Sequence, residues 1–163
     1  VVPLVNRYSP LLVVHPFSKS LSLALLRIGL SMGTPPIIEA HPLIKNSVPS
    51  YTMDRLAQAA AVRAYEDEGY YREINNKIIR ERERFKKILG EMGIPCTDSK
   101  SNFVFITLPD VKGPDALNPF REQGILVRNF AKIPRIADWL RITIGTKDDM
   151  DRVVEAIKKI MER

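Results

Sequence analysis

The chain has 163 residues, a formal net charge of +6 and an apolar share of 45%, which suits one domain or a domain with a small appendage. No apolar run approaches the ~20 residues of a membrane helix, and Val1–Leu4 has neither the charged flank nor the length of a signal peptide. The single cysteine, Cys96, excludes an internal disulfide. We therefore expect a soluble, cytoplasmic protein that makes no membrane contact.

The positive net charge raises the question of a nucleic-acid partner. In the run Arg80–Arg84, however, basic residues alternate with acidic ones. That alternation is typical of a solvated helix face with internal ion pairs, not of a stripe that follows phosphates. We therefore expect no nucleic-acid partner.

The first predicted element is a strand over Leu11–Val14, a short continuous apolar run of the kind that is buried on both faces. His15-Pro16 ends it, so Lys19 follows the end of a buried strand. Ligands of open α/β sheets bind at that edge, and a lysine held against apolar walls there loses its proton and attacks carbonyl groups.

Three polar side chains near Lys19 suit a phosphate, namely Ser18, Ser20 and Arg27. The pattern is short, however, and a loop lysine beside serines is often simply exposed to solvent.

From Val1 to Ile38 there is no acidic residue, and no glycine precedes Gly29. Complete α/β enzymes place turn glycines and acidic residues early, so we expect the sequence to start inside a fold.

The middle of the chain predicts a strand over Arg27–Met32, then a short helix capped by Thr34 with Pro35 at its first position. Residues 41–51 are expected to form a surface connection. Two helices follow, one from Thr52 to Gly69 and one that stops at Gly93. The first has an apolar face at helical spacing, made of Met53, Leu56, Ala57, Ala60, Ala61 and Ala64.

Beyond Gly93 the order of predicted elements is β-α-β-β-α, a small α/β lobe. The strands are expected at 102–108, 125–128 and 139–145, and the first helix at 114–124, with Pro119 inside it. Thr146 with Asp149 is a capping-box signature for the last helix. The core face predicted for that helix comprises Met150, Val153, Val154, Ile157 and Ile160.

Arg128 and Arg141 each stand inside an otherwise apolar strand run of the last strand pair. A guanidinium in that position is costly unless it meets an anion. Two such arginines on adjacent strands would grip a carboxylate or phosphate through forked hydrogen bonds. Structural ion pairs with Asp or Glu explain the pattern equally well.

Five motifs in this order resemble the histidinol-phosphate aminotransferases, which are similar to pyridoxal-phosphate enzymes of the aspartate aminotransferase type. They are Ser-Lys-(x)7-Arg-x-Gly from Ser18, Leu-Ala-Gln-Ala-Ala-Ala at 56–61, Ser-Asn-Phe-Val at 101–104, Gly-Ile-Leu-Val-Arg at 124–128 and Leu-Arg-Ile-Thr-Ile-Gly-Thr at 140–146. The resemblance runs nearly end to end. It implies an α/β fold in which this chain is the C-terminal half, comprising the end of the large α/β domain and the small lobe.

The resemblance also implies roles. Lys19 matches the lysine that forms a Schiff base with pyridoxal 5'-phosphate and then moves a proton at the substrate, and Ser18 and Arg27 match groups on the cofactor phosphate. Arg141 matches the arginine on the substrate's anionic end, and Arg128 a second anion contact. Such chemistry needs an electron sink, a lysine as general base and fixed positive charge at the anionic ends of the reactants. We expect no metal site, because His15 and His41 have no Cys, Asp or second His at ligand spacing.

The remaining expectations follow from the same resemblance. The substrates would be an amino acid such as histidinol phosphate, and 2-oxoglutarate, and the complete protein would be a homodimer. Residues 1–69 would be the C-terminal part of the large domain, and residues 94–163 would form the small domain. A helix over residues 70–93 would connect the two. The family's acidic residue that precedes the lysine has no counterpart here, so we expect this chain alone to be an inactive fragment.

Pro16, Leu25 and Leu30 depart from the family pattern, which has a hydroxyl residue, a glycine and an aromatic residue there. Two alternatives stay open. One is a pyridoxal-phosphate decarboxylase of a phosphorylated amino acid, and the other is a non-catalytic relic that acts by protein association. In the relic, the alanine face and Leu30 would be contact surface.

Overall fold

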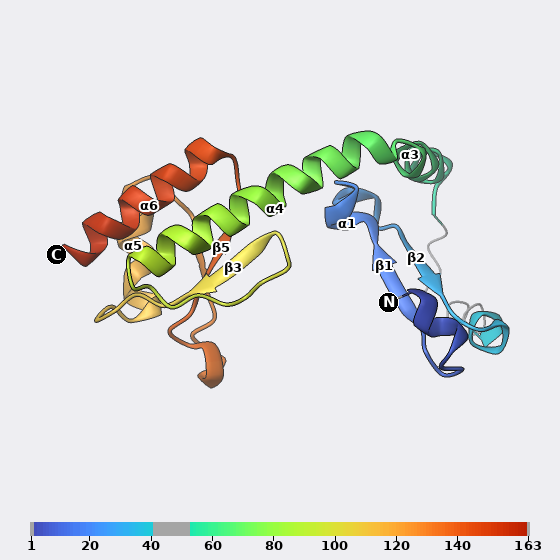
Figure 1. Ribbon diagram of the computed structural model, residues 1–163, viewed down its shortest axis with the longest axis horizontal. Helices are drawn as coiled ribbons and strands as arrows, with labels where there is room; N and C mark the ends of the chain where they lie inside the picture. Colours follow the sequence, from blue (N-terminus) through green and yellow to red (C-terminus); the bar gives the residue numbers. More distant parts are fainter. Residues whose placement is uncertain (1, 41–52, 163) are drawn as a thin grey trace. The chain divides into compact units, whose positions relative to one another are not determined.

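The computed structural model describes residues 2–40 and 53–162, and the chain divides into two compact units, Val1–Glu73 and Ile74–Arg163 (Figure 1). The division falls inside helix α4 (Glu68–Glu91), within the segment that was expected to connect two domains. The predicted surface connection at 41–51 lies outside the described residues. None of the helices that the structure describes combines the length and the apolar character needed to cross a bilayer.

Unit 1 is built on an antiparallel pair of strands with helical turns around it. Its described elements are η1 (Val2–Asn6), β1 (Val13–Pro16), α1 (Phe17–Ser20), η2 (Ala24–Leu26), β2 (Gly29–Met32), helical residues 35–40 and α3 (Arg55–Glu66). Strand β1 pairs with β2 from Val13 opposite Met32 to Pro16 opposite Gly29. The buried residues of its core cluster are Phe17, Ile28 and Ala57.

The expectation of a strand buried on both faces is wrong for unit 1. Within the predicted strand the side chains of Leu12 and Val14 are exposed, so one face of the strand is uncovered by the described residues. The predicted apolar face of α3 is also only partly right. Ala57 and Ala64 are buried, whereas Leu56 is 82% exposed.

Unit 2 is a three-stranded antiparallel sheet with helices on one face. Its elements after α4 are β3 (Phe103–Ile106), α5 (Gly113–Glu122), β4 (Arg128–Asn129), η3 (Pro134–Ile136), β5 (Leu140–Thr143) and α6 (Lys147–Met161). The sheet order is β3-β5-β4, and Figure 1 labels β3 and β5 of this sheet beneath α4. The predicted β-α-β-β-α order is therefore confirmed.

Alternation along the strands separates the two faces of the unit 2 sheet. Val104, Ile106, Leu140 and Ile142 point inward and are buried with residues of α4, α5 and α6. The predicted core face of α6 is buried as expected. The alternate residues of β3 and β5 therefore lie on the opposite face of the sheet, which we call the outer face.

Four of the predicted strands are shorter in the structure, and for two of them, β2 and β4, the reason is local. Arg27 has φ 55° and ψ 39°, a left-handed conformation at the end of η2, so β2 begins at Gly29. Gly124 has φ 72°, and Ile125 N–H donates to the Phe120 carbonyl at 3.0 Å. Residues 124 and 125 thus terminate α5, and the strand expected at 125–128 is found instead as β4 at Arg128–Asn129, which shares only Arg128 with it.

Candidate functional site

The predicted lysine lies in the connection between β1 and β2. The Phe17 N–H donates to the Ile28 carbonyl at 2.9 Å, next to the Pro16–Gly29 strand pair. This bond holds the two ends of the connection together. The structure therefore brings Ser18 and Lys19, just after β1, to the same end of the strand pair as Arg27, just before β2.

Gly29 makes this close approach possible. A Cβ at that position would lie 2.9 Å from the Pro16 Cα and 3.0 Å from the His15 carbonyl oxygen. Both neighbours are backbone atoms, so a side chain would force the strands apart. The glycine of the Ser-Lys-(x)7-Arg-x-Gly motif therefore sets the position of Arg27 relative to α1.

Lys19 follows a strand end, as predicted, but its surroundings differ from the expectation. The residue is exposed on α1, whereas Ser18 is half-buried. The apolar walls that would remove the proton from its ammonium group are absent from the described part of unit 1. Arg27 is also exposed, and no ion pair holds it within residues 2–40 and 53–162.

Ser20 has partners within its own loop. Its Oγ lies 3.2 Å from His15 Nε2 and donates to the Pro16 carbonyl at 3.5 Å. The His15 ring also meets Phe17 edge to face, with 5.8 Å between the ring centroids. His15 therefore helps to order the loop, a local role that the sequence did not indicate.

The two predicted arginines are direct neighbours across the last strand pair. Arg128 of β4 lies opposite Arg141 of β5. Directly opposed residues of an antiparallel pair project on the same face, and Arg141 is also opposite Phe105. Both guanidinium groups therefore belong to the outer face of the sheet.

Aromatic rings accompany both cations. The Arg128 guanidinium carbon lies 5.1 Å from the centroid of Phe130, and that of Arg141 lies 5.2 Å from the centroid of Phe103. Phe105 links the two rings, with its centroid 5.7 Å from Phe103 and 5.6 Å from Phe130. Cation–π contact orients a guanidinium while leaving its hydrogen-bond donors available.

Neither arginine forms an ion pair with a carboxylate among the described residues, so this structure does not support the alternative of structural ion pairs. Arg141 Nε is moreover buried without a hydrogen-bond partner. A buried donor without an acceptor is costly. The outer face therefore holds two adjacent cations and an unsatisfied donor, an arrangement that suits an anion.

Within the alternating Arg80–Arg84 run, Arg82 and Arg84 form the predicted internal ion pairs, with Glu83 and Glu81. Arg84 bonds Glu81 and Asp151, each at 2.6 Å, and these carboxylates, Glu81 foremost, raise the pKa of Arg84. One part of the expectation is wrong, because Arg82 is 5% exposed and not solvated. It donates to the Ser101 carbonyl at 3.0 Å and to Glu83.

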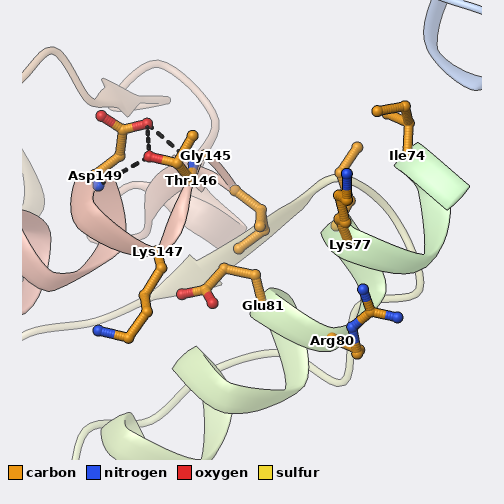
Figure 2. A pocket seen from close by; sticks show the side chains of 10 residues that line it. Ile74, Lys77, Arg80, Glu81, Gly145, Thr146, Lys147 and Asp149 are labelled. Atoms are coloured by element: carbon orange, nitrogen blue, oxygen red, sulfur yellow. Dashed lines mark hydrogen bonds between the residues drawn. The ribbon is translucent and has the colours of Figure 1, made fainter.

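A cavity of about 590 Å³ opens beside the start of α6, and none of the predicted site residues lines it. Lys77, Arg80 and Glu81 of α4 line it together with the Gly145–Asp149 segment, and Figure 2 shows Glu81 pointing toward Lys147. The Thr146 and Asp149 side chains form the predicted capping box there, which confirms the helix start. A second cavity, of about 600 Å³, lies between α3 and the Phe17 and Ile28 region of unit 1.

Sequence reasoning missed the aromatic residues beneath the arginines and the side-chain contacts of Asn129. Phe103 and Phe105 alternate with buried residues in β3, so strand alternation alone places them on the face that β5 shares with Arg141. No pattern in the sequence indicated the side-chain contacts of Asn129. Its contacts depend on a loop whose conformation the sequence does not specify.

A family model described as aminotransferase class I and II matches residues 1–157. The chain therefore belongs to the class I and II aminotransferases. It is 42% identical over 158 residues to the histidinol-phosphate aminotransferase of Clostridium acetobutylicum, an alignment that covers 97% of the chain and 45% of that enzyme. The chain thus spans less than half the length of this curated relative.

Solved structures agree with the expected fold. The histidinol-phosphate aminotransferase of Sinorhizobium meliloti in complex with pyridoxal-5'-phosphate is 27% identical, with a TM-score of 0.76 over 93% of this chain and 41% of that one. A decarboxylase from Sulfurospirillum multivorans is 25% identical, with a TM-score of 0.82 over 98% of this chain and 46% of that one. The predicted partial α/β transferase fold is therefore confirmed.

Proposed function

We propose that this chain carries part of the active site of a pyridoxal-phosphate aminotransferase that moves an amino group between histidinol phosphate, or a similar amino acid, and 2-oxoglutarate. The observation that carries the proposal is the Arg128–Arg141 pair on the outer face, with Arg141 Nε unsatisfied. Both reactants of this transfer are anions. The 42% identity to a histidinol-phosphate aminotransferase supports the choice of substrate.

The residues at the end of the β1–β2 pair fit pyridoxal phosphate by their chemistry. Lys19 offers a primary amine for the aldehyde, while Ser18 and Arg27 offer a hydroxyl and a guanidinium for the phosphate. The cofactor, when bound, supplies the electron sink for chemistry at the amino-acid carbon. Lys19 would hold the cofactor and then move a proton at that carbon, and Arg141, with Arg128 beside it, would fix the substrate's anionic end.

The domain assignment is part of the same proposal. Residues 1–69 are the C-terminal part of the large cofactor-binding domain, and residues 94–163 form the small domain. The helix over residues 70–93 connects the two domains. The complete protein is a cytoplasmic homodimer whose partners are its amino-acid substrate and 2-oxoglutarate.

We further propose that the chain alone is inactive. Unit 1 exposes large apolar side chains, among them Val14, Leu25 and Leu56, of which Leu25 is 91% exposed. Lys19 has no apolar walls there. The isolated chain should therefore fix pyridoxal phosphate with borohydride no better than any exposed lysine does. Stoichiometric, saturable fixation that Lys19→Ala abolishes would contradict this.

The function is tested in a chimaera in which this chain replaces the matching part of the Clostridium acetobutylicum enzyme. With histidinol phosphate and 2-oxoglutarate we expect glutamate to form. Arg141→Gln and Arg128→Gln should raise KM for histidinol phosphate at least tenfold, because each removes a charge-assisted contact. Arg121→Gln, at an exposed position of α5, is the matched control and should leave KM unchanged.

A second candidate function is decarboxylation of a phosphorylated amino acid, because the similarity to a decarboxylase structure covers 98% of this chain at 25% identity. The two arginines suit the phosphorylated amino acid of either reaction. Release of carbon dioxide from O-phosphothreonine, without glutamate formation, would favour the decarboxylase. If the chimaera binds no cofactor and the chain self-associates in sedimentation, the non-catalytic relic is favoured instead.

A further inference from the structure

We propose that Asn129 is a positioning residue that holds Arg128 opposite Arg141. The inference rests on the proposed anion site and adds a residue that does not itself reach the anion. Asn129 is opposite Leu140, which is fully buried, so its side chain belongs to the inner face of the sheet. It acts through the backbone next to Arg128 and not by contact with a ligand.

The register of the two arginines has little support from the strand ladder. Strand β4 has two residues, Arg128 and Asn129, and it lies at the edge of the sheet. Two like charges face each other across this short pairing without a carboxylate between them among the described residues. A slip by one residue would turn Arg128 to the inner face.

The Asn129 amide supplies the missing support. Its Nδ2 donates to the Ala137 carbonyl at 2.6 Å and to the Trp139 carbonyl at 3.0 Å. These carbonyls flank Asp138, immediately before β5 begins at Leu140. One side chain of β4 therefore binds the backbone that leads into β5 at two points and fixes the register.

Gly113, the first residue of α5, encloses this contact. A Cβ at Gly113 would lie 2.5 Å from Asn129 Nδ2 and 2.7 Å from the Asp138 carbonyl carbon. The Gly113 N–H also donates to Asp138 Oδ1 at 3.4 Å. A side chain at residue 113 would displace Asn129 or the loop, although Gly113 belongs to a helix and not to the arginine face.

The test uses the full 163-residue chain and inorganic phosphate as the probe. Phosphate is titrated while the Nε–Hε NMR signals of Arg128 and Arg141 are followed, and the thermal midpoint is measured alongside. Asn129→Ala should bind phosphate about tenfold more weakly, the loss expected when one charge-assisted contact goes. Cross-strand NOEs between β4 and β5 should disappear, while those between β3 and β5 remain.

Matched controls separate positioning from general damage. Asn118→Ala, at an exposed position of α5, should bind phosphate like the parent. Gly113→Ala should weaken binding although Asn129 is intact. Gly90→Ala should not, because a Cβ there meets nothing within 4 Å.

The outcomes are distinguishable from a failure of the proposed function. If phosphate does not shift the Nε–Hε signals of Arg128 and Arg141 in the parent chain, the proposed anion site is wrong. If the parent binds and folded Asn129→Ala binds equally well, the positioning role is overturned. Should Asn129→Ala not fold, Asn129→Ser, which can donate to one carbonyl only, takes its place, and parent-like affinity there overturns the proposal.

Discussion

Arg82 shows how a single residue ties a helix to the strand that carries part of the outer face. It is the buried charged residue of the described chain, and its Nη1 donates to the Ser101 carbonyl. Ser101 is two residues before Phe103, whose ring lies beneath Arg141. A buried guanidinium is tolerated because Glu83 and this carbonyl satisfy its donors.

Replacing Arg82 by methionine should lower the free energy of unfolding by about 1–3 kcal/mol, the cost of leaving the Ser101 carbonyl unpaired. Arg80→Met, on the exposed side of the same helix, should change it by less than about 0.5 kcal/mol. Urea unfolding measures both. Equal losses in the two variants would show that the buried bond contributes nothing.

The lowered pKa of the Asp98 carboxyl group predicts that the stability of the chain depends on pH. Hydrogen bonds from Lys86 and then Lys100 lower its pKa from 3.8 to about 2 in the folded chain. Because the pKa of Asp98 is lower in the folded than in the unfolded chain, the ionised carboxylate stabilises the fold at any pH above the pKa of the unfolded state. That stability is lost as the pH falls from about 4 toward 2.

Asp98→Asn should therefore be less stable than the parent at pH 7, and the difference should vanish near pH 2. Asp110→Asn, at an exposed turn residue with φ 58°, serves as the control because asparagine also tolerates that conformation. Thermal midpoints at each pH give the comparison. A difference between Asp98→Asn and the parent that is constant down to pH 2 would refute the assignment.

At the level of elements, the start of α6 depends on a reciprocal cap. Thr146 Oγ1 accepts a bond from the Asp149 N–H at 3.2 Å, and Asp149 Oδ2 accepts one from the Thr146 N–H at 2.9 Å. Thr146→Ala should cost about 1 kcal/mol of stability, whereas Thr146→Ser should stay close to the parent. Calorimetry of the three chains tests this, and an unchanged Thr146→Ala would argue against the cap.

Elements whose signals are local were predictable from the sequence. The capping pair at Thr146 and Asp149, the alternation in β3 and the helical spacing of α6 each depend on neighbours within a few residues. The adjacency of Arg128 and Arg141 followed in the same way from two strand runs joined by one loop. The chemistry assigned to those arginines rests on the resemblance, and it stays a proposal.

Features set by distant packing were not predictable. Burial of β1 and Lys19 was expected from an apolar run, but such a run does not say what covers it. The short β4 depends on how α5 ends, where Gly124 and Ile125 bond back to the helix. The Asn129 contacts need the folded 130–139 loop.

At the level of the whole molecule, the two units differ in how much core they possess. Among residues 2–40 and 53–162, the core cluster of unit 2 draws buried residues from the sheet and three helices, whereas the core cluster of unit 1 has three buried residues, Phe17, Ile28 and Ala57. Stability rises with buried apolar area. The free energy of local unfolding should therefore be higher for unit 2 than for unit 1.

Hydrogen exchange should show slow amides in β3, β5 and α6 and fast amides in β1 and β2. Ile157 is fully buried in unit 2, so Ile157→Ala should reduce the protection of unit 2 by about 2–5 kcal/mol, and Ile157→Val by about 0.5–1.5 kcal/mol. Protection of unit 1 should not change. An equal loss of protection in both units would contradict the prediction that the effect stays within the core of unit 2.

The most direct test of the central claim is to locate the lysine that holds pyridoxal phosphate in the chimaera described above. The holoenzyme is reduced with borohydride, digested and mapped by mass spectrometry, with Lys19→Ala and Lys100→Ala as paired variants. We predict one phosphopyridoxyl group per chain on Lys19, retained in Lys100→Ala and absent from Lys19→Ala. A label on another lysine, or full labelling of Lys19→Ala, would contradict the claim that this chain carries the cofactor lysine.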